Sequence, residues 1–487
     1  MKDHKPKNIA KNLQEKKLKK EEKKREKQML KGKLFRLIDS FIPENIDLAL
    51  AMITHNQSLK DACKNRYYPL MRKVDPAMGR SFQILKDIVD KIANDYSANF
   101  ALDVLIHYHQ LNEPEAIAHS VKESILAKVE SISDADLIEK ICTLENLPDN
   151  LFKKIELSWR ETSFHIPPNA RCFSGLKELK INNRHQYEQF RPVLPTILAI
   201  DLLEINNSEL KELPSEITKL SSVSFLDIRE NNLNQLPAEF ANLQQLTSLY
   251  LCNNNFDKIP LVLKQLPQLN LLWMQYNALK EIPDWIIQQP LDTLELSHNK
   301  ITSVPIELFK SNTLRTLELN HNKLNTIQVS AQQCTKSLIW LELSHNPLKG
   351  FPEDLLHLQP LKYLNVESCG LKALSKNLHQ LKNLETLNIG QNDLVTFPEN
   401  IGKMSKLEAI WASENPLTHL PESIGDLTQL TNLGLRKTKL TALPESIKKL
   451  KKLQHLDLRH SKIKENSSMA TQIKQWLPKC NVLIGNW

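Results

Sequence analysis

The chain has 487 residues and a formal net charge of +8, with 41% hydrophobic and 25% charged residues. This composition is typical of a globular protein and excludes a wholly disordered chain. No run of 18 apolar residues indicates a membrane span, and the opening MKDHKPKNIAKN lacks the apolar segment of a secretory signal. We therefore expect a cytoplasmic protein without a membrane span.

Motifs for cofactor binding and catalysis are missing from the sequence. None of the ten glycines lies in a GxGxxG or GxxxxGKS/T frame, and no HExxH or nucleophile-elbow motif occurs. The seven cysteines form no CxxC pair, so we expect reduced, mainly structural thiols. We predict no enzyme, no catalytic residues, no cofactor and no metal.

Residues 1–34 form a basic tail. They carry fourteen Lys and Arg against five Asp and Glu, a net charge of +9, which leaves the rest of the chain near −1. One interpretation is a solvated arm, flexible or helical. Another is contact with RNA, the ribosome or an anionic membrane, although no aromatic residues are interleaved to favour nucleic acid.

Residues 35–169 have the apolar spacing of short helices, as in PENIDLALAMI, where Ile46, Leu50 and Ile53 share one face. Short polar joins between such segments predict antiparallel helix pairs. Cys63 and Cys142 lie in this region without a neighbouring acid and histidine, which indicates structural thiols.

From Leu176 the pattern becomes a repeat with the frame LxxLxLxxNxL. About thirteen units follow at intervals of 22 to 24 residues, and the first, LKELKINN, is the weakest. The clear frames start at Ile200, Val223, Leu246, Leu269, Leu291, Leu314, Leu338, Leu361, Leu384, Leu407, Leu430 and Leu453. We assign the array to 170–465 and a closing cap to 466–487.

Most units also carry an apolar residue followed by proline, as at Leu213-Pro214 and Leu443-Pro444, and then an xxIxxL segment. Two units depart from this pattern, at Ile327-Gln328 and Leu374-Ser375. Together these motifs resemble the leucine-rich repeat family, and in particular its cytosolic 23-residue LPxxIxxL class, which includes Ras-binding scaffold proteins and bacterial members.

This resemblance implies an α/β fold: a curved leucine-rich repeat solenoid with a parallel concave sheet, preceded here by an N-terminal all-α region. It also implies that the Asn of each frame turns inward and bonds backbone groups of neighbouring coils. Ser208, Cys369, Thr438 and Ser461 stand at this position in four units, and Arg184 stands there in the first.

The residue between the second and third Leu of each frame points to the concave face, because strand side chains alternate. Aromatic residues gather there or one outward position earlier, and we predict that they contact a partner; packing over neighbouring strands is the alternative. We expect Tyr250, Trp273 and the nearby Tyr276 to cluster across two neighbouring repeats. Trp340 and Tyr363 lie one strand position earlier in the frame, and Trp411 lies in the column itself.

Glu295, Glu318 and Glu342 occupy adjacent strands of the same column. Stacked carboxylates should raise one another's pKa and favour a cationic partner. The alternative is that duplication of the LEL segment copied them without a binding role. His298, His321 and His345 form a second column at the rim, where a pH response is a better hypothesis than a metal site because parallel columns do not converge on one ion.

The sequence thus predicts a non-enzymatic scaffold or adaptor that binds a protein or peptide, with a basic surface if the Glu column functions. Two alternatives remain open: a substrate-recruiting part of an effector or ligase system, and RNA or ribosome association through the basic tail. The oligomeric state is not predicted.

Overall fold

The computed structural model describes residues 131–132, 154–156, 173–331 and 336–485. The chain divides into two compact units, Met1–Ile132 and Ser133–Trp487. Within the first unit the description covers only β1 (Ser131–Ile132). The basic tail and most of the predicted helical region 35–169, with Cys63 and Cys142, therefore lie outside the described residues.

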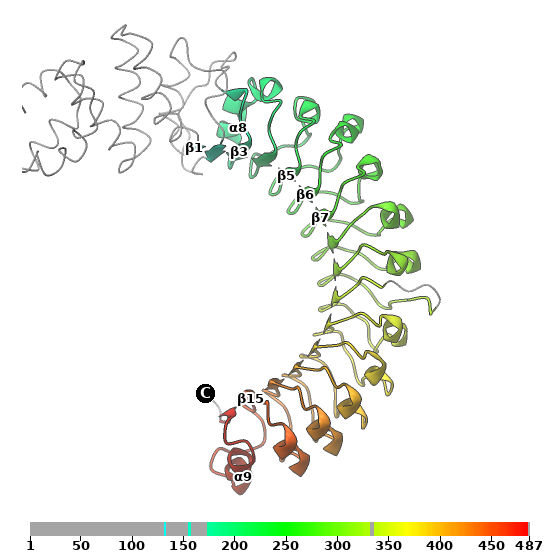
Figure 1. Cartoon of the computed structure of the whole chain (residues 1–487), viewed down its shortest axis with the longest axis vertical. Helices are drawn as coiled ribbons and strands as arrows, with labels where there is room; N and C mark the ends of the chain where they lie inside the picture. The colour runs from blue at the N-terminus through cyan, green and yellow to red at the C-terminus, as the bar shows by residue number, and fades with distance from the viewer. Residues whose placement is uncertain (1–130, 133–153, 157–172, 332–335, 486–487) are drawn as a thin grey trace, which may run out of the picture. The chain divides into compact units, whose positions relative to one another are not determined.

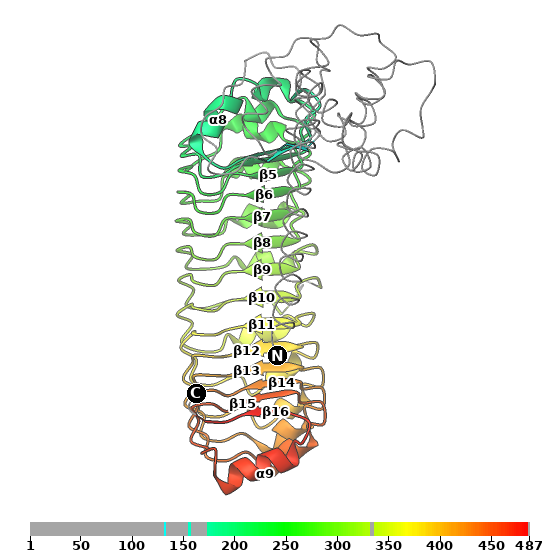
Figure 2. The same ribbon diagram turned by 90° about the vertical axis from the view of Figure 1, so that its left-hand side faces the viewer.

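The second unit is built on one parallel sheet whose strands follow sequence order. Figure 2 shows the strands stacked as a ladder, and Figure 1 shows that they line the concave side of this unit. The strands are β2 (Lys154–Glu156), β3 (Glu178–Ile181), β4 (Leu202–Ile205), β5 (Phe225–Asp227), β6 (Ser248–Tyr250), β7 (Leu271–Trp273), β8 (Thr293–Glu295), β9 (Thr316–Glu318), β10 (Trp340–Glu342), β11 (Tyr363–Asn365), β12 (Thr386–Asn388), β13 (Ala409–Trp411), β14 (Asn432–Gly434), β15 (His455–Asp457) and β16 (Asn481–Leu483).

Short helices lie on the outer side of the unit, opposite the strands (Figure 1). Among the described residues two of them are α-helices, α8 (Arg184–Phe190) and α9 (Ser468–Trp476). The others are single turns of 3₁₀-helix: η2 (Leu194–Thr196), η3 (Ile217–Lys219), η4 (Ala238–Asn242), η5 (Leu261–Gln265), η6 (Asp284–Gln288), η7 (Ile306–Lys310), η8 (Glu353–His357), η9 (Leu378–Gln380), η10 (Ile401–Lys403), η11 (Glu422–Asp426) and η12 (Glu445–Lys449).

The prolines of the repeat start these outer turns. Pro260, for example, precedes η5, and its carbonyl accepts the N–H of Leu263 at 3.1 Å. Proline fixes its own φ and needs no hydrogen-bond acceptor for a missing N–H, so it suits this position. At Ser375, where proline is absent, the carbonyl still accepts the N–H of Leu378, and η9 is short.

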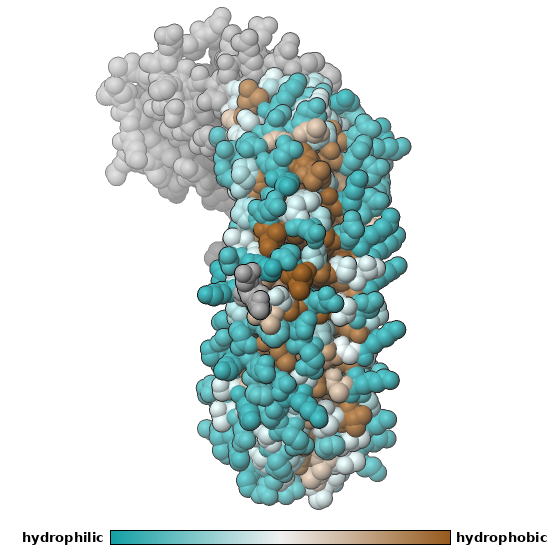
Figure 3. Space-filling model, turned by 90° about the vertical axis from the view of Figure 1, so that its right-hand side faces the viewer, coloured by the Kyte–Doolittle hydropathy of each residue, from teal (hydrophilic) through white to brown (hydrophobic). Residues whose placement is uncertain are grey.

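The outer face mixes hydrophilic and hydrophobic residues, and the hydrophobic ones gather along its middle (Figure 3). Leu261 and Ile306, at the starts of η5 and η7, are among the exposed hydrophobic side chains.

The core lies between the sheet and the outer turns. Leu294 and Leu296 are fully buried, and so are their equivalents along the described repeats, while the residue between them belongs to the concave face. This alternation is the period-2 pattern of a strand that covers a core with one face.

A ladder of buried Asn side chains joins successive coils. The Oδ1 of Asn322 accepts the N–H of Ile301 in the preceding coil at 2.9 Å, and its Nδ2 donates to the carbonyls of Leu296 and Leu319. Cys369 takes the same place, and its Sγ donates to the carbonyl of Leu343. The inward ladder expected from the family resemblance is thus confirmed.

Two helical segments occupy the ends of the described array. α8 belongs to the first of the repeats, in which Arg184 stands at the position of the ladder Asn. At the other end, α9 and β16 lie in the range predicted to close the array, with Ile473 and Leu477 buried and Trp476 half-buried.

The predicted fold, a leucine-rich repeat solenoid with a parallel concave sheet, is confirmed for the second unit. β2 pairs in parallel with β3, so the sheet includes residues upstream of the predicted start of the array at residue 170. β1 and β2 are the described residues of the range for which helices were predicted, and the helical region itself stays a prediction.

Replacing a ladder residue should destabilise the solenoid. We predict that Asn322→Ala lowers the free energy of unfolding by about 1 to 3 kcal/mol, because it leaves the buried N–H of Ile301 without a partner and removes one of the two amide donors to each of the carbonyls of Leu296 and Leu319. Urea denaturation followed by circular dichroism measures this loss. Asn320→Ala, two residues away and half-buried, is the matched control, and an equal loss in both variants would contradict the account.

Candidate partner-binding face

The concave residues stand in one register across the sheet. Trp273 pairs with Glu295, Glu295 with Glu318, and Glu318 with Glu342. Parallel strands lie about 4.8 Å apart, so these side chains are immediate neighbours. We call the residue at this position in each strand, from Lys180 to Asp457, the concave column.

Several column residues bond their own backbone. Glu295 accepts the N–H of Ser297 at 2.9 Å, and Glu342 accepts the N–H of Ser344 at 3.0 Å. The same contact, from the N–H two residues later, is made by Asp227, Asn365, Asn388 and Asp457. A side-chain oxygen in this column therefore accepts a backbone N–H at the end of the strand. This hydrogen bond is a structural reason for Glu, Asp or Asn at this position.

Glu295 and Glu342 favour the protonated form more than an exposed glutamate does. The pKa of Glu295 is raised to about 8, first by burial and then by a hydrogen bond with Glu318, while the hydrogen bond from Ser297 lowers it. Burial also raises the pKa of Glu342, against hydrogen bonds from Ser344 and Asn365. The mutual effect predicted from stacking is present, but burial is the larger cause.

One aromatic cluster lies at β5 to β7. Tyr250 packs on Phe225 at 5.0 Å and on Trp273 at 4.9 Å between ring centroids. The guanidinium of Arg229 lies 5.6 Å from the Tyr250 centroid and is bonded to Asp227, which is fully buried. The indole N–H of Trp273 is buried without a hydrogen-bond partner.

A second aromatic pair lies at β10 and β11. The rings of Trp340 and Tyr363 are parallel within 4°, with centroids 3.6 Å apart, and Trp340 is 38% exposed. The Tyr363 hydroxyl donates to Glu342 at 3.3 Å. Burial, and next the charge of Glu342, raise the pKa of Tyr363, so this hydroxyl stays protonated.

Trp411 of β13 is a third exposed aromatic, with 43% of its surface accessible. Its neighbour in the column is Gly434 of β14. A Cβ added at Gly434 would lie 2.9 Å from Cε3 of Trp411, closer than carbon atoms approach without displacement. The missing side chain is what leaves room for the indole over β14.

Tyr276 belongs to the rim and not to the cluster of Tyr250 and Trp273, which corrects the predicted grouping. It stacks on His298 at 4.1 Å between ring centroids, and the stack continues through His321 at 4.1 Å and His345 at 4.0 Å. All four residues have φ between 53° and 56°, a left-handed conformation that places each ring beyond its strand.

Two histidines of this rim stack, His298 and His321, favour the neutral form. Burial and the charge of His345 lower the pKa of His298, and the same causes, with His298, lower the pKa of His321. The parallel rings do not converge on one point. Among the described residues no group of His, Cys, Asp and Glu is placed to hold a metal ion.

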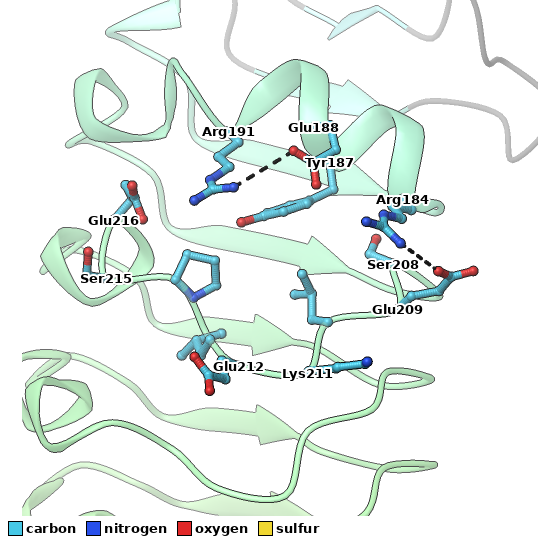
Figure 4. Close-up of a pocket in the computed structure, with 13 residues that line it drawn as sticks. Arg184, Tyr187, Glu188, Arg191, Ser208, Glu209, Lys211, Glu212, Ser215 and Glu216 are labelled. Atoms are coloured by element: carbon cyan, nitrogen blue, oxygen red, sulfur yellow. Dashed lines mark hydrogen bonds and ion pairs between the residues drawn. The ribbon is translucent and has the colours of Figure 1, made fainter.

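A pocket of about 530 Å³ lies outside the concave face, between α8 and the loop that follows β4 (Figure 4). Tyr187 lies in its wall, and its hydroxyl is buried without a partner. Arg184 is bonded to Glu209 at its rim, and Arg191 faces Glu188. The sequence analysis did not single out this pocket, because no motif marks a contact between one coil and the next.

Other residues of the concave face were also missed. Phe225, Arg229 and Gly434 complete the aromatic sites described above. Reading the sequence at the outward positions before and after the column, unit by unit, would have found the first two.

Comparisons with known proteins agree with the fold. A profile described as a leucine-rich repeat region matches residues 157–284, and a second, described as leucine rich repeat, matches residues 289–348. These residues of the chain are therefore leucine-rich repeats. Their assignment to the 23-residue class stays a prediction. No curated protein sequence is significantly similar to this chain.

Solved structures show the same architecture. A leucine-rich repeat protein of Leptospira interrogans is 24% identical, with a TM-score of 0.54, over 72% of this chain and 99% of the other. A chain of the Toll–Spatzle complex of Drosophila is 21% identical, with a TM-score of 0.58, over 75% of this chain and 55% of the other. At these identities the likeness shows the fold alone.

No described helix is both long and apolar enough to cross a membrane.

The raised pKa of Glu295 predicts a pH-dependent stability. A carboxyl with an ordinary pKa near 4.5 when unfolded and about 8 when folded stabilises the fold fully below pH 4.5 and loses that contribution as pH rises to 8. The free energy of unfolding should therefore fall less between pH 5 and 8.5 in Glu295→Gln than in the unchanged chain. Urea titrations at each pH test this, with the exposed Glu399→Gln as control; parallel pH profiles for Glu295→Gln and the unchanged chain would contradict it.

The rim stack predicts the opposite dependence at acid pH. Because the folded pKa values of His298 and His321 lie below the ordinary 6.5, their contribution is present above pH 6.5 and is lost as pH falls through the lowered values. We expect His321→Asn, which keeps a side chain suited to positive φ, to reduce the fall in Tm between pH 7 and pH 5. An unchanged fall would show that the rim stack does not contribute.

Proposed function

We propose that this chain is a non-enzymatic, cytoplasmic scaffold or adaptor that binds a protein or peptide through its concave face. The observation that supports this proposal most directly is the exposure of Trp340 and Trp411 on strands whose other, apolar face is already buried in the core. Large aromatic side chains held on a rigid sheet in water are typical anchors of protein interfaces.

The aromatic sites are held in place before a partner binds. Trp340 rests on Tyr363, which is itself bonded to Glu342, and Trp411 lies over Gly434. Binding would therefore cost little side-chain entropy at these positions. The two sites lie three strands apart, at a strand spacing of about 4.8 Å, so a partner of modest size can contact both.

Two described cysteines support a structural role for the thiols. Cys252 and Cys369 are buried and free, and burial raises the pKa of each to about 12. Such thiols are poor nucleophiles. Buried free cysteines also suit the reducing compartment proposed from the sequence.

The proposal is tested by affinity capture from the native cell, followed by measurement of Kd with the captured partner. We expect Trp340→Ala and Trp411→Ala each to weaken binding by about 2 kcal/mol or more, roughly thirtyfold in Kd. Trp285→Ala on the outer helix η6 is the matched control and should leave Kd unchanged.

The opposite pattern would overturn the proposal. If Trp285→Ala abolished binding while both concave variants retained it, the partner would bind the outer face. Circular dichroism of each variant verifies that the fold is kept.

A further inference from the structure

The aromatic pair of Trp340 and Tyr363 stands beside a carboxylate that the chain leaves without a cation. Elsewhere in the concave column each acid has one. Glu204 pairs with Lys180 at 3.3 Å, Asp227 pairs with Arg229, and Asp457 pairs with Arg459 at 2.7 Å. In the last two cases the arginine lies two residues after the acid.

The same position is uncharged after the three glutamates. Ser297, Asn320 and Ser344 follow Glu295, Glu318 and Glu342 by two residues, and no ion pair to these glutamates occurs among the described residues. Any cation in this part of the column must therefore come from another molecule or from residues outside the described ranges.

Of the three glutamates, Glu318 is the one whose carboxyl can accept further hydrogen bonds. Glu295 accepts the Ser297 N–H, and Glu342 accepts from Ser344, Tyr363 and Asn365. Glu318 has a hydrogen bond with Glu295 but no donor of this kind from its own backbone.

Trp340 lies within reach of Glu318. It pairs directly with Thr316 of β9, and Glu318 is two residues further on the same face of that strand. Diagonal neighbours of this kind are about 7 to 8 Å apart. Tyr363 covers the ring face toward β11, so the other face is directed toward β9, where the opposing side chain is the small Thr316.

The chain itself shows what fits such an arrangement. In β5 and β6 the guanidinium of Arg229 binds Asp227 and lies over the ring of Tyr250. Acid and aromatic ring lie there on adjacent strands, as Glu318 and Trp340 do. A planar guanidinium can bond a carboxylate with its N–H groups while its face stacks on a ring, which an ammonium group does less well.

We propose that an arginine side chain of the bound partner inserts between the open face of Trp340 and the carboxylate of Glu318. This inference rests on the proposed function and names the chemistry of the partner at β9 and β10. It commits to a guanidinium because the Glu318 carboxyl has no ion pair among the described residues and exposed aromatic surface lies beside it.

A direct probe avoids the need to know the partner. The full chain is labelled with 5-fluorotryptophan, the Trp340 resonance is assigned with Trp340→Phe, and acetyl-Gly-Arg-Gly-amide is titrated in. The same peptide with citrulline in place of arginine has nearly the same shape without the charge.

We expect the arginine peptide to shift the Trp340 resonance saturably and the citrulline peptide to leave it in place. Glu318→Gln should weaken binding of the arginine peptide by at least about tenfold in Kd, whereas Glu399→Gln should leave Kd unchanged. A citrulline response equal to that of arginine, or an affinity unchanged by Glu318→Gln, would overturn the inference.

A second variant supplies the arginine from the chain itself. Asn320→Arg places an arginine two residues after Glu318, as Arg229 follows Asp227, and should abolish the peptide response without loss of Tm. Asn320→Gln, uncharged at the same position, should retain the response. A response that persists in a folded Asn320→Arg chain would contradict the proposal.

The two proposals fail separately. If the arginine peptide did not shift the Trp340 resonance while Trp411→Ala still weakened binding of the captured partner, only the arginine site would be wrong. If no concave variant affected the captured partner, the proposed function itself would fall.

Discussion

The structure of the second unit depends on one interaction, the hydrogen bonding of a buried Asn across successive coils. Each side chain accepts a backbone N–H from the preceding coil and donates to carbonyls of both, as Asn299 does for Leu279 and for Met274 and Leu296. Buried backbone groups without partners are costly. The ladder therefore holds neighbouring coils in one register, and this register creates the concave column.

A fixed register turns sequence differences into surface chemistry. With Leu buried on one face of every strand, the chain can vary only the outward positions without loss of the core. At β5 and β15 these positions hold an acid with its own arginine. At β8 and β10 they hold glutamates whose pKa is raised by burial and which accept backbone N–H groups, with aromatic rings on both sides.

The repeat frame was predictable from sequence because it follows from a period of about 23 residues. The inward Asn and the outer turns were expected from the resemblance to the leucine-rich repeat family. The concave location of Trp340 and Glu318 followed from alternation. What the sequence did not reveal depends on neighbouring coils: the burial of Glu295, the stacking of Tyr276 on His298, and the space over Gly434 that Trp411 fills. Such contacts are set by side-chain direction and sheet curvature, which no single repeat encodes.

Amide hydrogen exchange of the chain with its captured partner tests the central claim most directly, because it maps the bound surface without substitutions. The account predicts slower exchange on binding in β7 to β13 and in the residues that follow each strand at the rim, with little change in the outer 3₁₀ turns. Protection confined to the outer turns, with the concave strands unchanged, would contradict it.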